Sequence, residues 1–594
     1  MKIYQFLMLI FPALVFISCE DDELLGTKPN NELGDEYIWD LPQKAEGVLM
    51  NAYNAIPMFI DNYGGNFLDV ATDNAVTNDY GSAVFDLAHG GLTATDQQPV
   101  ANWSQAYEQI NYVNLFFENG LRDDLPYHLD ESTSETHKTR LRGEAHFLRA
   151  WWLSELLRVY GGVSDDGEAL GVPVLTSPVP EDQNITENLE RSTYEETTEQ
   201  IFNDCDSAVK YLPMQYDSGK SPLSSQHIGR ATQKAALALK ARMATYAASP
   251  AYQSETTPDD VVTEKWERAA RFCYEAINAG QLGQYSKLRK RDMVGGRLSS
   301  TPDEYLFRVF HNTNGMESRN LPPAFLGEGR TNPSQNLVDA FPADNGYPIS
   351  DSRSNYDPQD PYESRDQRLS LTVYHNGMNV ENGGRGLEIF YDRNEESPGK
   401  DAPGYFYDNT RTGYYLNKWI SSTPDMLDVD NTQNDFHMHP LLRRAEVYLS
   451  YAEASNQAVG PEGIVDGCDR SAKSIINEIR QKSGGISDQT YVDEIAAQGK
   501  QAFNELILNE RRIELAFENH RYFDLRRWKM PLDETIRGVE IEKTGDELVY
   551  HGTDPDGEAI EVEERELEGE KYYYTPLPYD ELVKSPQMKN NKGW

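Results

Sequence analysis

Apolar residues recur every three or four positions over long stretches of the chain, and this period constrains its fold most strongly. In Thr139–Tyr160 the apolar positions are Leu141, Ala145, Leu148, Trp152, Leu156 and Tyr160. This spacing places them on one face of a long amphipathic helix. The same period marks further segments, which are Trp103–Asn114, Thr193–Leu212, Arg230–Ala248, Glu264–Ala279, Leu441–Gln457, Ala472–Lys482 and Gln501–Trp528. We therefore expect a mainly α-helical protein.

Alanine occupies interior positions of these segments, for example Ala238, Ala241, Ala269 and Ala452. Small side chains allow paired helices to approach each other closely. Consecutive helical hairpins of this kind suggest tetratricopeptide-like pairs, although no strict repeat of about 34 residues is present.

Between about residues 280 and 440 the helical period disappears, and Gly, Pro, Asn, Asp and Tyr dominate. A long irregular stretch inside a compact protein is usually functional. Further on, residues 540–570 alternate polar and apolar side chains around a turn at Thr553–Gly557. That pattern predicts a small β-hairpin.

The start of the chain has the layout of a secretory signal. Lys2 precedes an apolar run, Phe6–Ile17, which is followed by Ser18 and Cys19. The run is shorter than the roughly 20 apolar residues of a membrane-spanning helix. We predict a bacterial lipoprotein signal peptide over 1–18, with Cys19 as the lipid attachment site; an ordinary signal peptide followed by a chance cysteine is the alternative. The acidic run Glu20–Glu23 resembles a surface-export signal of lipoproteins, or serves as a solvated tether.

The chain is strongly acidic, with 55 Lys and Arg residues against 97 Asp and Glu residues and a formal net charge of −42. Nucleic acids and anionic membranes are bound through clustered Lys and Arg, so this composition argues against both as partners. Beyond Cys19 the cysteines are Cys205, Cys273 and Cys468, and no C-x-x-C pair is present. Cys205 and Cys273 lie in helical patterns and are predicted to be buried free thiols.

Catalytic and cofactor signatures are largely missing from the sequence. Gly219-Lys220-Ser221 resembles the end of a phosphate-binding loop, but Met214 stands where that motif requires glycine. His437 and His439, with Asp435 beside them, lack an evident third metal ligand. The stretch Asp428–Asn431 starts like a calcium loop and then departs from it. We therefore predict no cofactor, no metal and no catalytic residue.

One segment carries an unusual buried charge. Glu510 falls on the apolar stripe formed by Phe503, Leu506, Ile507, Ile513 and Phe517. A buried carboxylate must be paired, and bidentate hydrogen bonds make arginine the expected partner. We favour a structural ion-pair network over an active-site acid at this position.

Several segments of the chain together are specific enough to indicate a protein family. The most specific is NERRIELAFENHRYFDLRRW, at residues 509–528. Others follow in the family's order, namely WSQAYEQINYVN at 103–114, RGEAHFLRAWWLSELLRVYGGV at 142–163, GRATQKAALALKARM at 229–243, LLRRAEVYLSYAEA at 441–454 and the ending YYYTPLPYDELVKSPQMKNNKGW. Together these segments resemble the SusD/RagB family of outer-membrane nutrient-binding lipoproteins, and the resemblance extends from Cys19 to Trp594.

The resemblance implies a SusD-like scaffold of about four tetratricopeptide-like helix pairs, with a loop-rich ligand-binding part and minor β-hairpins. It divides 19–594 into an N-terminal part, about 19–225, and a C-terminal part, about 226–594, with the loop-rich region at about 280–440. It implies a lipid-anchored, surface-exposed protein of the outer membrane that is not an enzyme. Its expected partners are a glycan and a SusC-like TonB-dependent transporter, which imports the captured nutrient.

No family motif fixes the ligand site, so its residues are predicted from their chemistry. Tyr63 and Tyr80 stand in Gly-containing loops, where exposed rings could stack on sugars. The other candidates are Asp73 and Asn78, as hydrogen-bond partners of sugar hydroxyls, and Phe325 and Arg330 in the loop-rich region. Peptide capture by a RagB-like protein and, less favoured, glycoside hydrolysis remain as alternative functions.

Overall fold

The computed structural model describes residues 35–57, 63–180, 188–216, 222–279, 287–288, 292, 302–308, 315–380, 385–421 and 437–594. Cys19 and the predicted signal peptide lie outside these residues, as do Gly219–Ser221, Asp428–Asn431 and Asp435. Within the described part, no helix has the length and apolar character needed to cross a membrane.

The scaffold is built from long helices, as the apolar period predicts. Its members are α2 (Pro42–Asn54), α4 (Trp103–Asn119), α5 (Glu131–Tyr160), α6 (Tyr194–Tyr211), α7 (Gln233–Ala248), α8 (Asp259–Asn278), α13 (Arg444–Val459), α14 (Ala472–Ile479), α15 (Thr490–Gln498) and α16 (Lys500–Glu514). Helix α5 begins earlier than predicted because the Asp130 side chain caps it by accepting a hydrogen bond from Thr133 N. A capping box formed by Thr193 and Glu196 fixes the start of α6.

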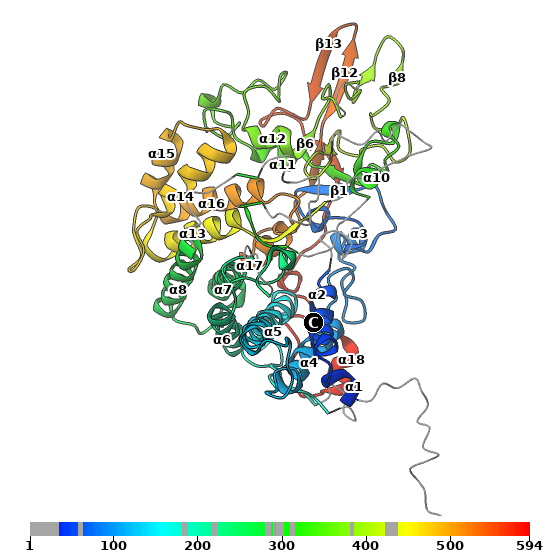
Figure 1. Ribbon diagram of the computed structural model, residues 1–594. Coiled ribbons are helices and arrows are strands. Elements are labelled where there is room, and N and C mark those ends of the chain that lie inside the picture. The colour runs from blue at the N-terminus through cyan, green and yellow to red at the C-terminus, as the bar shows by residue number, and fades with distance from the viewer. Residues whose placement is uncertain are drawn as a thin grey trace, which may run out of the picture.

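The scaffold helices pack in chain order, which gives the tetratricopeptide-like arrangement. Helix α5 packs against α4 and α6, α7 against α6 and α8, and α13 against α8, α14 and α16. Figure 1 shows this row of helices running from α4 at the bottom to α15 at the upper left, with the loop-rich part beside its upper end. Nearly every side chain of α7 is buried, which accounts for its alanine content. The prediction of a mainly helical fold is confirmed.

The predicted helix Gln501–Trp528 is wrong, because the chain breaks it into α16 and α17 (Arg521–Arg527). Phe517 and Asn519 between them have left-handed φ angles of 56° and 61°. The buried carboxylate of Asp69 accepts hydrogen bonds from the backbone N–H groups of both residues, at 2.9 and 3.3 Å. These bonds satisfy backbone donors that a continuous helix would otherwise have paired, and they join the break to the loop after α2.

The loop-rich part contains short helices and small sheets. Its short helices include α3 (Ala83–Ala88), α10 (Met316–Asn320), α11 (Gln335–Ala340) and α12 (Gln367–Thr372), while α1 (Asp35–Trp39) and α18 (Tyr579–Lys584) lie near the ends of the chain. The two-stranded sheets pair β1 (Ala75–Thr77) with β5 (Thr331–Pro333), β2 (Gly162–Val163) with β3 (Ala169–Leu170), β4 (Tyr305–Arg308) with β10 (Pro440–Arg443), β6 (Val373–Tyr374) with β9 (Tyr415–Leu416), and β11 (Ile536–Gly538) with β14 (Ile560–Glu563).

A four-stranded sheet has the order β13-β12-β7-β8 and contains the predicted hairpin. Strands β12 (Glu540–Thr544) and β13 (Glu547–His551) are antiparallel, and β7 (Tyr391–Asp392) pairs with both β12 and β8 (Ser397–Pro398). The prediction places the hairpin turn at Thr553–Gly557, but the strands turn at Gly545-Asp546, where Gly545 has a φ of 65°. A glycine in this conformation is typical of tight hairpin turns.

The predicted ion-pair network around Glu510 is confirmed. Glu510 is fully buried, and its Oε1 and Oε2 atoms accept from Arg480 Nη1 at 2.7 Å and Arg368 Nη2 at 2.9 Å. Arg368 also pairs with Asp366, which extends the network through the core. Cys205 and Cys273 are buried free thiols, as predicted.

Candidate ligand-binding site

The loop that follows α2 is held rigidly against the scaffold. The buried carboxylate of Asp73 accepts from Arg521 through two bonds, Nε to Oδ1 and Nη2 to Oδ2, both of 2.8 Å. Arg512 Nη2 lies 2.9 Å from the same Oδ2. Burial by itself raises the pKa of a carboxyl, but the charges of Arg512 and Arg521 outweigh it and hold the pKa of Asp73 well below its usual range.

Asn78 links this loop to two distant segments. Strand β1 pairs with β5, and Asn78 N continues the ladder by donating to Arg330 O. The Asn78 side-chain Nδ2 donates to the carbonyls of Glu328, at 2.8 Å, and Asp408, at 2.6 Å. Since one amide group joins three loops, their relative positions are fixed before a ligand binds.

Tyr80, two residues after Asn78, has an exposed ring that Phe85 and Arg411 support. Its side chain is 47% exposed and meets Phe85 edge to face, with ring centroids 5.4 Å apart. The Arg411 guanidinium lies 5.0 Å from the Tyr80 ring centroid. Arg411 Nη1 in turn donates to Thr77 O at 3.0 Å and Glu563 Oε2 at 2.6 Å. This cation therefore supports the ring and is already paired.

Three consecutive aromatic residues are exposed on the neighbouring loop. Tyr405, Phe406 and Tyr407 have exposed fractions of 45%, 44% and 86%. Asn409 anchors the loop through hydrogen bonds from its Nδ2 to the carbonyls of Lys400 and Ala402, at 3.0 and 2.7 Å. Contiguous exposed aromatic surface of this kind marks an interaction site.

These elements surround an open groove of about 680 Å³, which we call the aromatic groove. Its floor and walls include Tyr80, Pro403, Phe406, Tyr407, Asn409, Thr410, Arg411, Val539, Glu540, Ile560 and Glu561. The size is that of a small-molecule binding site. Residues from β12, β14 and the loops after β1 and before β9 therefore meet at one place on the loop-rich part.

Of the six predicted ligand residues, Tyr80 lines the aromatic groove. Arg330 does not line it; its guanidinium contacts Glu328, lies 3.7 Å from Asp79 Oδ2 and donates to Gly64 O at 3.4 Å. Asp73 and Asn78 are buried and make the structural bonds described above, of which the bond from Asn78 to Asp408 O reaches the loop that lines the groove.

The other two aromatic candidates are buried. Tyr63 is 8% exposed and lines a cavity of only about 60 Å³ with Trp151 and Arg158. Phe325 is 2% exposed, and the Arg385 guanidinium covers its ring at 4.5 Å from the centroid. Neither ring presents an open face, so the structure does not support them as stacking platforms.

The sequence interpretation missed Tyr405, Phe406, Tyr407 and Arg411. A signal was present, because three adjacent aromatic residues follow Gly404 in a polar, glycine-containing loop. Adjacent residues of a strand point to opposite faces, so three adjacent aromatic side chains cannot all enter one core. The run also lies in the loop-rich region, which was already predicted to be functional.

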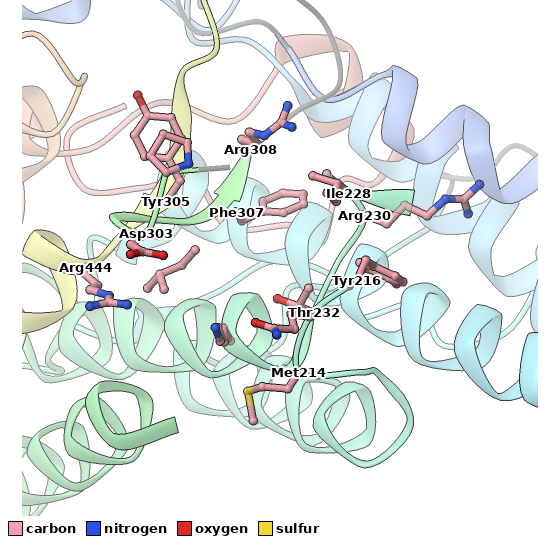
Figure 2. A pocket seen from close by; sticks show the side chains of 15 residues that line it. Met214, Tyr216, Ile228, Arg230, Thr232, Asp303, Tyr305, Phe307, Arg308 and Arg444 are labelled. Carbon is pink, nitrogen blue, oxygen red and sulfur yellow. The ribbon is translucent and has the colours of Figure 1, made fainter. Parts of the chain in front are cut away.

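A second hollow, of about 250 Å³, lies between α7, β4 and the segment 214–216. Figure 2 shows that Tyr305, Phe307 and Arg308 reach it from β4, while Arg444 and Arg230 flank it from other elements. Arg230 is paired with Glu46 and Glu144, and Phe307 packs edge to face on Phe147 and Trp151. These side chains already have partners within the scaffold, so the aromatic groove is the stronger candidate for the ligand site.

A metal centre has no support in the described part of the chain, where no group of three potential ligands occurs. His437 Nε2 lies 2.8 Å from Glu317 Oε1, and both residues are fully buried. Burial, and to a smaller extent the neighbouring His437, lower the pKa of His439. The histidine pair is part of the packed interior.

Comparisons with known proteins agree with this architecture. A family model described as "SusD family" matches residues 300–594, and one described as "Starch-binding associating with outer membrane" matches residues 23–244. The fold and these matches place the protein among the helical binding proteins that associate with the outer membrane. The chain belongs to the SusD family, as its signature segments indicated.

Individual relatives are distant but cover nearly the whole chain. A SusD-like protein of Formosa agariphila is 24% identical, covering 91% of this chain and 93% of that protein. A crystal structure of a SusD-like protein from Bacteroides fragilis is 25% identical, with a TM-score of 0.70, covering 95% of this chain and all of the other. Another from the same species, described as a SusD-like carbohydrate-binding protein, is 21% identical, with a TM-score of 0.68 and coverages of 93% and 99%.

Proposed function

We propose that this protein captures glycans at the cell surface and delivers them to a partner TonB-dependent outer-membrane transporter, without catalysing a reaction. The observation that carries the proposal is the aromatic groove, where Tyr80, Phe406 and Tyr407 meet on a supported loop surface. The faces of pyranose rings carry C–H groups that pack well on aromatic faces. The carbohydrate-binding description of a relative with this fold supports the same ligand class.

The groove also has the polar groups that a sugar requires. Glu540 and Glu561 are exposed acceptors in its lining, whereas the buried Asn409 and Thr410 hold the loop through internal hydrogen bonds. Ligand sites commonly combine apolar walls with a few polar groups that orient the ligand. The rigid support of Tyr80 reduces the entropy lost on binding, because the ring is already held in place.

The class of ligand is tested by titrating purified protein, in a calorimeter, with soluble starch, xylan, mannan, galactan and a mixture of short peptides. We expect heat of binding from at least one polysaccharide and none from the peptides. Binding to peptides alone would replace the proposal with the RagB-like alternative. Release of reducing sugar that the Glu540→Gln or Glu561→Gln change abolishes would instead establish a glycoside hydrolase.

Charge at the groove favours an uncharged glycan. Arg411, a cation in the wall, is paired with Glu563 at 2.6 Å, whereas the described residues offer no ion-pair partner to Glu540 or Glu561. A sulfate or uronate brought close to these carboxylates meets repulsion of about 1–4 kcal/mol at separations near 4 Å, depending on solvent screening.

We expect a neutral oligosaccharide to bind at least about tenfold more tightly than its sulfated form, corresponding to about 1.4 kcal/mol. The Glu540→Gln/Glu561→Gln double variant lacks both negative charges, so its affinities for the neutral and the sulfated oligosaccharide should differ less. Calorimetry at low and high salt measures both affinities. Glu505→Gln, at an exposed position of α16, is the matched control. Equal or tighter binding of the sulfated form by the unaltered protein would contradict the assignment of a neutral ligand.

The membrane anchor is a second part of the proposal and rests on the sequence before the described residues. Acyl chains on Cys19 would hold the protein at the membrane, because each buried methylene contributes about 0.8 kcal/mol. We expect metabolic labelling with palmitate to mark the unaltered protein and not the Cys19→Ala variant. The anchored protein should also co-purify with a large outer-membrane transporter. Equal labelling of the variant, or a processed protein that carries no acyl chains, would contradict lipid attachment at Cys19.

A further inference from the structure

Another hollow, distinct from the one between α7 and β4, adjoins the aromatic groove beside the four-stranded sheet. It has a volume of about 370 Å³, and we call it the hairpin hollow. Its walls include Phe390, Tyr391, Arg393, Pro398, Ile541 and Glu542. The register of the sheet brings them together, because Tyr391 lies opposite both Pro398 on β8 and Glu542 on β12.

The hairpin hollow has the same chemistry as the aromatic groove on a smaller scale. The Tyr391 side chain is 39% exposed, and the Arg393 guanidinium lies 5.7 Å from its ring centroid. Arg393 is paired with Glu542, just as Arg411 beside Tyr80 is paired with Glu563. Each hollow thus presents an exposed tyrosine ring braced by an arginine whose charge is already balanced by a glutamate.

The two hollows are neighbours that share part of their lining. Pro403, Val539 and Glu540 line both of them. Pro403 and Glu540 are exposed at this boundary, so they offer a ring face and a hydrogen-bond acceptor to anything that crosses it. Val539 fixes the boundary to the body of the protein, since its backbone N donates to Thr412 O at 2.8 Å.

We infer that the ligand is a linear oligosaccharide chain whose sugars occupy the aromatic groove and the hairpin hollow together. This inference rests on the proposed glycan-capturing function and adds the length of the ligand to it. The aromatic groove supplies the primary contact, because its volume is larger and three exposed aromatic rings line it, namely Tyr80, Phe406 and Tyr407. The hairpin hollow then adds affinity for chains long enough to cross Pro403 and Glu540, since the second contact becomes intramolecular once the first is made.

The test uses ladders of malto-, xylo-, manno- and galacto-oligosaccharides, from disaccharide to octasaccharide, titrated calorimetrically. Within the ladder that binds, we expect the affinity to rise at least about tenfold with chain length and then to level off. Tyr391→Ala should remove this rise while leaving the affinity for the shortest binding chain unchanged. Tyr391→Phe should keep it, because the ring is retained.

Tyr579→Ala serves as a control, since Tyr579 is exposed on α18, at the opposite end of the molecule from β12 and β13 (Figure 1). Melting temperatures within a few degrees of the unaltered protein establish that the variants fold. Equal affinity for all chain lengths would overturn the inference and leave glycan capture intact. A Tyr391→Ala variant that keeps the full length dependence would overturn it as well. Binding of no carbohydrate would overturn both this inference and the proposed function.

Discussion

Replacing Glu510 by Ala should lower the free energy of unfolding by about 3–5 kcal/mol, the cost of removing one partner from a buried ion pair. The change leaves the Arg368 and Arg480 guanidinium groups inside the core without the carboxylate that joins them. Because Arg368 is also bonded to Asp366, the loss should spread through the helices around α16. Equilibrium denaturation in urea, followed by circular dichroism, measures the effect.

Glu505→Ala on the same helix is the matched control, because Glu505 is exposed and surface changes usually alter stability by less than about 0.5 kcal/mol. Glu510→Gln should be nearly as destabilising as Glu510→Ala, since it keeps the shape of the side chain but not its charge. Unchanged stability in both Glu510 variants would show that the network contributes little. Loss of sugar processing with unchanged stability would point to the active-site acid that the structure does not favour.

The burial of Glu510 could be predicted from the sequence, whereas the break between α16 and α17 could not. The burial of Glu510 follows from its position on an apolar stripe of period 3.6, which a single segment contains in full. The break at Phe517 and Asn519 depends on hydrogen bonds to Asp69, which lies 448 and 450 positions away in the sequence. Leu515-Ala516-Phe517 has no helix-breaking residue, so a continuous helix was the natural prediction.

The candidate site also contains some residues that local sequence predicts and others that depend on distant contacts. Tyr80 could be predicted as an exposed ring because Asp79 and Gly81 flank it. Its partnership with Phe406 and Tyr407 could not, since it depends on the pairing of β1 with β5 and on the bond from Asn78 to Asp408, 330 positions away. From the local sequence, the Asp73 carboxylate could equally be a hydrogen-bond acceptor for a ligand. Its structural role depends on its ion pairs with Arg512 and Arg521, which lie far away in the sequence.

Replacing both Tyr80 and Tyr407 by Ala should weaken glycan binding by at least about 100-fold, or roughly 2.7 kcal/mol. Both rings stand at the groove, and buried aromatic anchors at the centre of binding sites typically contribute about 2 kcal/mol or more each. The single variants should each lose at least about tenfold. Calorimetry with the polysaccharide that binds the unaltered protein measures these losses.

Two controls separate binding from folding in this prediction. Tyr63→Ala removes a buried ring outside the groove, so it should lower the melting temperature more than the affinity. Tyr579→Ala removes an exposed ring from α18 and should change neither. Full binding by the Tyr80→Ala/Tyr407→Ala variant, with its fold intact, would remove the aromatic groove from the ligand site.

The most direct test of the central claim is a crystal structure of the protein soaked with the neutral oligosaccharide that binds it most tightly. The account predicts a sugar ring packed at roughly 4 Å, the ordinary van der Waals distance, against Tyr80, Phe406 or Tyr407 in the aromatic groove. A sugar bound elsewhere, for instance in the hollow between α7 and β4, with the groove empty, would contradict it.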